Sequence, residues 1–287
     1  MHKIQAKTIL GSENGMNIYR GCQHGCIYCD ARSDCYNMNH QFEDIEVKEN
    51  APELLETALR KKRRRCMIGT GAMSDPYIPL EKELKITRRC LEIIDRYHFG
   101  IAIQTKSNLI MRDIDLLESI NRKAKTVVQM TITTADEALS RIVEPNVCTS
   151  KERFEVLCEM KKRGIPTVIW LCPLLPFIND TPENVKAIVE TAHKAGVYGI
   201  ITFGMGLTLR SGDREYYYAA LDRHFPGLKQ RYIRQFGTNY EIPSPNSREL
   251  WKIFTEECDK YGICRNTNEI FTYLHTLEEP EQLTIEI

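Results

Sequence analysis

The run Cys22-Gln23-His24-Gly25-Cys26-Ile27-Tyr28-Cys29 brings three cysteines together at the spacing C-x3-C-x2-C. Gly21 precedes the run and Gly25 interrupts it, so the backbone can turn its amides towards a centre bound by the thiolates. Three thiolates from one loop can hold three corners of a cubane iron–sulfur cluster and leave the fourth iron open. An open coordination position is typical of a catalytic metal site. The run therefore predicts a metal–sulfur site that keeps one position for a ligand.

Other states of these thiols remain possible from the sequence. Zinc would need a fourth ligand, which His24, Asp30 or Cys35 could supply. A disulfide and unliganded thiols are further alternatives. Four more of the 11 cysteines fall within strand or helix patterns and are interpreted as small buried side chains: Cys66, Cys90, Cys158 and Cys172. Two others lack partners at a cluster spacing, and their role stays open together with that of Cys35: Cys258 and Cys264.

Around this loop the chain alternates between strand-like and helix-like stretches. Strands are expected near residues 18–19 and at 67–69, 100–104, 126–132, 167–171 and 198–203. Helices are expected between them, at 51–65, 84–98, 113–123, 150–163 and 181–195. Such repetition with short connections predicts parallel strands covered by helices. Six strands fit a partial (β/α)6 barrel or a doubly wound sheet, and in both folds ligands collect at the carboxyl ends of the strands.

The pattern changes after about residue 211. Helices are expected over 215–223, 228–235 and 247–261, followed by a short β-prone tail. No low-complexity linker separates the two parts. We therefore expect a core barrel with its N-terminal lead-in at 1–211 and a mainly helical extension at 212–287 that packs on it.

Composition restricts the class of protein. The 287 residues are 42% hydrophobic and 27% charged, which is typical of a globular chain. The 39 basic residues balance the 39 acidic ones, which argues against a dedicated polyanion binder. The first ten residues include Lys3 and Lys7 and no apolar core of a signal peptide, and three prolines break the apolar stretch at 166–178. We expect a cytoplasmic protein without a membrane span.

The cysteine run, with Tyr28 as its aromatic residue, resembles the signature of the radical S-adenosylmethionine (SAM) enzymes. Residues 19–32 resemble the spore photoproduct lyase-like branch, and similar segments follow in order at 74–81, 105–107, 112–117, 131–134, 144–145 and 173–176. The resemblance implies a partial (β/α)6 barrel and a 4Fe–4S cluster held by Cys22, Cys26 and Cys29, with SAM at its open iron. One electron, from a donor such as flavodoxin or ferredoxin, then cleaves SAM to a 5′-deoxyadenosyl radical that abstracts hydrogen from the substrate.

The resemblance also implies which residues contact SAM. Ser74, with Asp75 beside it, would meet the amino acid end of SAM. Lys106, after the third strand, would pair with the SAM carboxylate. Thr131 keeps a hydroxyl where the family usually shows serine, and Tyr28 would lie near the adenine. No catalytic residue is assigned.

One departure from the family pattern concerns the substrate. In spore photoproduct lyases a hydrogen-donating cysteine lies just before the serine that contacts SAM, but Ala72 and Met73 precede Ser74 here. A thioether has no S–H hydrogen to give, and Cys35 is the nearest candidate thiol in the sequence. The substrate is therefore unassigned. A lyase that repairs DNA lesions is one alternative, and a non-catalytic metal- or iron–sulfur-binding interaction module is another.

Support for a nucleic acid partner is limited. Six consecutive cations at 60–65 could contact phosphates, but they also suit the C-terminal end of a helix dipole. The tyrosines at 216–218 are interpreted as packing, and Glu144-Pro145 as a corner that ends a helix.

Overall fold

The computed structural model of the chain describes residues 1–277. Its centre is a sheet of six parallel strands in the order β2, β5, β6, β7, β8, β9, over Gly15–Met16, Met67–Thr70, Gly100–Thr105, Thr126–Thr131, Thr167–Trp170 and Gly199–Ile201. Spatial order follows chain order, whereas a doubly wound sheet reverses direction at a central strand. The order therefore selects the partial barrel over the doubly wound sheet and confirms the predicted (β/α)6 fold.

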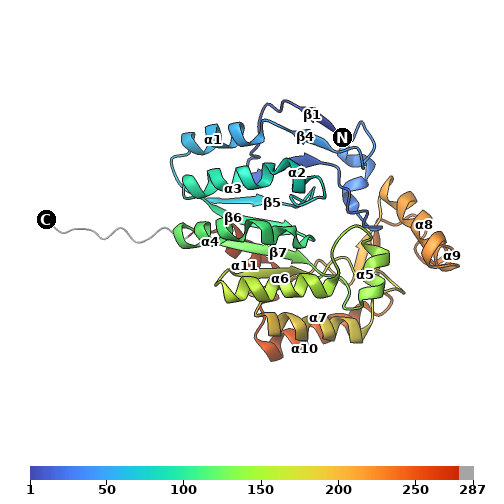
Figure 1. Cartoon of the computed structure of the whole chain (residues 1–287). Helices are drawn as coiled ribbons and strands as arrows, with labels where there is room; N and C mark the ends of the chain where they lie inside the picture. The colour runs from blue at the N-terminus through green and yellow to red at the C-terminus, as the bar shows by residue number, and fades with distance from the viewer. Residues whose placement is uncertain (278–287) are drawn as a thin grey trace.

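Helices cover the outer face of this sheet. Figure 1 shows them side by side: α1 (Ala51–Lys61), α3 (Ile86–Arg96), α4 (Ile114–Lys123), α6 (Ser150–Lys162) and α7 (Pro182–Ala195). Short helices α2 (Glu81–Leu84), η3 (Asn108–Asp113) and α5 (Glu137–Val143) lie in the connections. Thr181 caps the first turn of α7 by accepting from the amide of Asn184 at 3.2 Å.

The two faces of the sheet differ because side chains alternate along each strand. Outward-facing residues such as Ile101, Ile103 and Val128 pack in the main core under the helices. Inward-facing residues near the strand starts, such as Val127 and Val168, pack against α11 (Thr267–His275). Helix α11 thus closes the floor of the barrel and leaves the carboxyl ends of the strands open.

The first barrel strand differs from the prediction. Residues 15–16, not 18–19, form β2, which pairs with β5. Tyr19–Arg20 forms β3 in a separate three-stranded sheet with β1 (His2–Ile4) and β4 (Glu46–Lys48). Ile18 and Tyr19 are buried, as their apolar side chains indicated. However, the antiparallel pairing of β3 with β4 places this segment in the small sheet and not in the barrel.

The C-terminal part contains α8 (Asp213–His224), α9 (Leu228–Phe236), α10 (Ser247–Tyr261) and a hairpin of β10 (Gly206–Thr208) with β11 (Glu241–Pro243). The β-prone tail was predicted wrongly where α11 forms, and residues 278–287 lie outside the described part. Helix α10 packs on α7, and the division at residue 211 stays a prediction. Among residues 1–277, no helix has both the length and the apolar character to cross a membrane.

The basic run lies away from the open end of the barrel. Helix α1 ends at Lys61, so most of the run at 60–65 leaves the helix just before β5 begins. Lys62 donates to the side chain of Asn14 at 2.6 Å. Because the cavity described below lies beyond the other end of β5, these cations do not border it.

Candidate functional site

The cysteine loop begins directly after β3 and rests on the segment before β4. Gly21 has a φ of +89°, and a Cβ atom there would lie 2.4 Å from the carbonyl oxygen of Phe42. The amide of Cys22 donates to that same carbonyl at 3.2 Å. Only glycine fits this close approach without strain, so the sequence fixes the direction in which the loop leaves the strand.

The loop forms one wall of a cavity of about 820 Å³ at the carboxyl ends of the strands. Segments that follow β5 to β9, with β10 and β11, supply the other walls. All of the predicted site residues line it: Cys22, Cys26, Tyr28, Cys29, Ser74, Asp75, Lys106 and Thr131. The structure thus gathers into one cavity residues that are up to about a hundred positions apart in the sequence.

The three thiols suit a cluster better than a single ion. All three are free rather than disulfide-bonded. Zn–S bonds of about 2.3 Å would hold the sulfurs within about 3.8 Å of one another. Within residues 1–277, however, no set of three potential ligands that includes these cysteines lies within 4.8 Å. The three sulfurs are therefore not gathered as closely as a mononuclear zinc site requires.

The candidates for a fourth zinc ligand have other surroundings. The ring nitrogens of His24 are buried, and Nε2 lies 3.8 Å from Asp75. The carboxylate of Asp30 accepts from Tyr36 at 2.7 Å. Cys35 is exposed and its sulfur accepts from Arg210 at 3.1 Å. Asp30 and Cys35 therefore have other partners, whereas neither ring nitrogen of His24 has a hydrogen-bond partner among residues 1–277.

The charge of Lys106 affects the pKa of each cysteine in the loop. Burial raises the pKa of Cys22 to about 12 and also raises the pKa of Cys26 and Cys29, while the charge of Lys106 opposes all three shifts. Burial by itself would lower the pKa of Lys106, but interactions with nearby acidic groups, first Cys26 and then Glu144, raise it overall. The ammonium therefore stays charged and can neutralise anionic groups bound in the cavity.

Ser74 and Asp75 brace the loops around Lys106. The Ser74 hydroxyl donates to the carbonyl of Gly21 at 2.6 Å and ties the loop after β5 to the cysteine loop. One oxygen of Asp75 accepts from Thr105 at 2.7 Å, and the other accepts from the amide of Lys106 at 2.8 Å. Asp75 is therefore a positioning residue for Lys106, and a direct contact with SAM stays a prediction.

Tyr28 contacts a buried ion pair that could not be identified from the sequence. Its hydroxyl donates to Glu144, and Glu144 pairs with Arg153 at 2.5 Å, with both side chains fully buried. Arg153 also donates to the carbonyls of Thr131 and Cys148 at 2.9 and 2.8 Å. Glu144 does follow the end of α5, as the corner interpretation expected, but its carboxylate holds the cysteine loop in place.

The inner face of the strands supplies residues that the sequence analysis missed. Gln104 lines the cavity and its amide lies 3.5 Å from the Thr131 hydroxyl. Trp170 and Cys172 line it as well. Cys172 was interpreted as a small buried side chain, but it follows the end of β8, where alternation turns it into the cavity. Cys90 is fully buried, as predicted.

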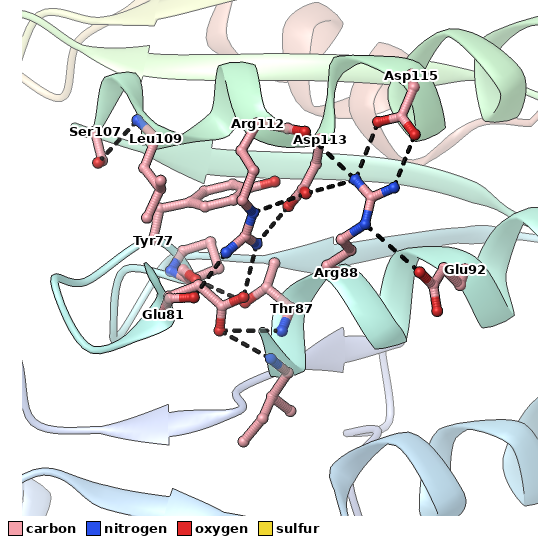
Figure 2. A network of polar contacts seen from close by, with 12 residues as sticks. Tyr77, Glu81, Thr87, Arg88, Glu92, Ser107, Leu109, Arg112, Asp113 and Asp115 are labelled. Carbon is pink, nitrogen blue, oxygen red and sulfur yellow. Dashed lines mark hydrogen bonds and ion pairs between the residues drawn. The ribbon is translucent and has the colours of Figure 1, made fainter. Parts of the chain in front are cut away.

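A second, partly buried network of ion pairs and hydrogen bonds holds the segments that follow β5 and β6. Glu81 is fully buried and accepts from Tyr19 of β3. Figure 2 shows Arg112 between Glu81 and Asp113, at 2.8 and 2.7 Å, and Arg88 between Asp113 and Asp115. The network joins β3, the segment after β5 and the segment after β6. The loops that carry Ser74 and Lys106 are thus anchored at both ends.

The tyrosines at 216–218 pack as expected. The hydroxyls of Tyr217 and Tyr232 lie 2.9 Å apart in a buried cluster. The guanidinium of Arg32 lies 3.7 Å from the ring centroid of Tyr216, so α8 packs against the segment that follows the cysteine loop.

Comparisons with known proteins show which family and which relatives this chain resembles. Residues 16–181 match the model of the Radical SAM superfamily. An uncharacterized protein of Mycobacterium tuberculosis is 27% identical over 256 residues, which cover 87% of this chain and 74% of that protein. An uncharacterized protein of Methanocaldococcus jannaschii is 33% identical over 186 residues, covering 62% of this chain and 69% of that protein.

The fold also resembles a solved structure. A spore photoproduct lyase variant with bound SAM and dinucleoside spore photoproduct superposes with a TM-score of 0.60 at 11% identity. The match covers 85% of this chain and 72% of that one. At this identity the likeness concerns the fold alone.

Replacing Arg153 by methionine should test the buried pair. Arg153→Met leaves the Glu144 carboxylate buried without its cation, which costs about 3–5 kcal/mol. We expect the free energy of unfolding in urea to fall by that amount. Lys194→Met, which breaks an exposed pair with Glu190, should change it by less than about 0.5 kcal/mol. Equal effects of the two substitutions would contradict this assignment.

Proposed function

The chain belongs to the radical SAM superfamily, and we propose that it cleaves SAM reductively to provide a 5′-deoxyadenosyl radical for hydrogen abstraction from a substrate. Membership implies an enzyme with a 4Fe–4S cluster and SAM as cofactors, served by an electron donor such as flavodoxin or ferredoxin. The observation that carries the proposal is the cavity that one buried and two half-buried cysteines line together with a charged lysine. It favours the enzyme over a non-catalytic interaction module.

The residues that line the cavity would have separate roles in binding the cluster and SAM. Cys22, Cys26 and Cys29 would hold the cluster, which when bound supplies the electron and an open iron for SAM. Lys106 would donate to the SAM carboxylate. The Ser74 hydroxyl gives its hydrogen to Gly21, so its oxygen is left to accept from the SAM ammonium.

Two further side chains would orient the nucleoside end of SAM. Thr131 lies on the inner face of the sheet, where its hydroxyl is within reach of a ligand in the cavity. The ring of Tyr28 lies 5.9 Å from the Lys106 ammonium and presents an apolar surface for the adenine. Both residues would position SAM.

The cluster assignment can be tested by metal analysis. Substituting Cys22, Cys26 and Cys29 together by alanine should abolish bound iron and sulfide after anaerobic reconstitution, since no thiolates remain in the loop. Cys258→Ala and Cys264→Ala should retain both, because these residues lie outside the cavity wall. Full iron retention in the triple variant, or stoichiometric zinc at the wild-type loop, would refute the assignment.

The role of Lys106 can be tested by calorimetry on reconstituted protein. Lys106→Ala should weaken SAM binding by about 1–3 kcal/mol, the range for a lost charge-assisted hydrogen bond. Iron content should not change, because Lys106 is not a proposed ligand. Lys82→Ala, an exposed lysine in α2, serves as the matched control. An unchanged affinity for SAM in Lys106→Ala would remove it from the site.

Repair of a DNA lesion is the second candidate function. It is favoured by the likeness in fold to spore photoproduct lyase. Against it, Met73 lines the cavity where that family carries its donor thiol, and Met73 has no S–H hydrogen. Among the described residues that line the cavity, Cys172 is the one thiol outside the cysteine loop, whereas Cys35 is absent from the lining.

The photoproduct itself separates the two candidates. Reduced protein with SAM should produce 5′-deoxyadenosine. Given a dinucleotide that contains the thymine photoproduct, it should yield mostly off-pathway adducts and little intact thymine, because no thiol adjoins Ser74. Product chromatography measures both. Clean conversion to paired thymines that survives Cys172→Ala and Cys35→Ala would contradict this expectation and favour the lyase.

A further inference from the structure

A group of potential metal ligands lies outside the cavity, on the three-stranded sheet. His2 begins β1 and pairs in register with Glu46 of β4. His40 comes from the loop that precedes β4, and its ring meets that of His2 edge-on at 4.8 Å between centroids. One ligand atom from each of His2, His40 and Glu46 lies within 4.8 Å of the others.

The two histidine rings are oriented by their Nδ1 atoms. His2 Nδ1 lies 3.0 Å from a carboxylate oxygen of Asp44, and His40 Nδ1 lies 2.9 Å from the carbonyl oxygen of Gln41. Both oxygens accept hydrogen bonds, so Nδ1 carries the hydrogen in each ring. In the neutral rings each Nε2 then presents a lone pair.

These lone pairs converge on Glu46. The Nε2 atoms of His2 and His40 lie 3.9 and 4.0 Å from the same carboxylate oxygen, too far for a direct hydrogen bond. His40 Nε2 is buried and has no hydrogen-bond partner within the described residues. Three acceptors thus face one another with no hydrogen atom between them, and a cation would satisfy all three.

The chemistry of the set matches zinc. Two imidazole nitrogens and one carboxylate, completed by water, are a common Zn²⁺ site, and the Nδ1 contacts to a carboxylate and a carbonyl are the outer partners such ligands usually have. Bonds of about 2.0–2.1 Å imply ligand separations of about 3.4 Å. The two Nε2 atoms would therefore each need to move about 0.6 Å closer to the Glu46 oxygen. The His2 side chain is 39% exposed, which leaves an entry path.

We propose that His2, His40 and Glu46 bind one Zn²⁺ ion, with water as the fourth ligand, in a site independent of the cluster. The ion would fasten β1 and the loop before β4 to the small sheet. That loop carries Phe42, whose carbonyl accepts from the amide of Cys22, and Arg20 donates to the carbonyl of Tyr36 at its start. The site would therefore stabilise the segment on which the cysteine loop rests.

The proposal can be tested by metal analysis of the anaerobically reconstituted holoenzyme. The protein is produced without a polyhistidine tag and is dialysed against zinc-containing and then zinc-free buffer. We expect about one zinc per chain in addition to the iron. His40→Ala and the isosteric Glu46→Gln should each lower zinc at least about tenfold, since loss of one of three protein ligands removes most of the affinity. Iron content, which also reports correct folding, should stay at the wild-type level.

Two control variants locate the ion. His224→Ala, an exposed histidine of α8, should keep the zinc. The triple alanine variant of Cys22, Cys26 and Cys29 should lose its iron and still keep one zinc, which separates this site from zinc in the cysteine loop. Wild-type protein without stoichiometric zinc, in which the histidines are simply neutral or protonated, would overturn the proposal. Zinc retained by both Glu46→Gln and His40→Ala would do the same.

Thermal melting gives a second readout that does not depend on activity. Added zinc should raise the melting temperature of zinc-depleted, iron-loaded wild-type protein by a few degrees, because a ligand that binds only the folded state stabilises it. Glu46→Gln should melt at the same temperature with and without zinc. An equal shift in both proteins would count against the site.

Discussion

A carboxylate buried away from water must be paired with a cation. The buried Glu144–Arg153 ion pair meets this requirement, and the contacts that it makes hold the segments around the cavity in place. Taking each ion out of water costs several kcal/mol, which the attraction offsets only when further hydrogen bonds complete the set. Here the completing bonds come from Tyr28 in the cysteine loop and from Arg153 to the carbonyls of Thr131 and Cys148. One pair therefore binds the end of β7, the start of α6 and the cysteine loop, and a shift of any of them would leave a buried charge unsatisfied.

The same low-dielectric surroundings act on the thiols. Burial raises the pKa of Cys22, Cys26 and Cys29, so without metal the loop keeps its protons, and metal binding must release them. Lys106 opposes the shift because its charge favours the thiolates. The cation that suits a SAM carboxylate thus also lies close enough to the three thiols to favour their ionised form.

Features of this protein that depend on local sequence patterns could be predicted. Features that depend on contacts between residues distant in the sequence mostly could not. The cysteine spacing and the strand alternation are local, and they located the cysteine loop and five of the six barrel strands. The resemblance to the radical SAM enzymes indicated the other predicted residues of the cavity wall: Tyr28, Ser74, Asp75, Lys106 and Thr131. Glu144 looked like a corner because its partner Arg153 is nine residues on and Tyr28 is 116 residues away. The first strand was misplaced because pairing with β4, not apolarity, decides where Tyr19 goes. Cys172 and α11 were misread because both depend on which face of the sheet they meet.

The helix that closes the floor of the barrel has a kinetic consequence. With α11 packed under Val127 and Val168, molecules enter and leave the cavity at the carboxyl ends of the strands. A compound bound near the floor of the cavity is covered by one bound at its open end. The order of arrival then becomes a property of the architecture: whatever binds deepest is first in and last out, and its release waits on departure of the molecule above it.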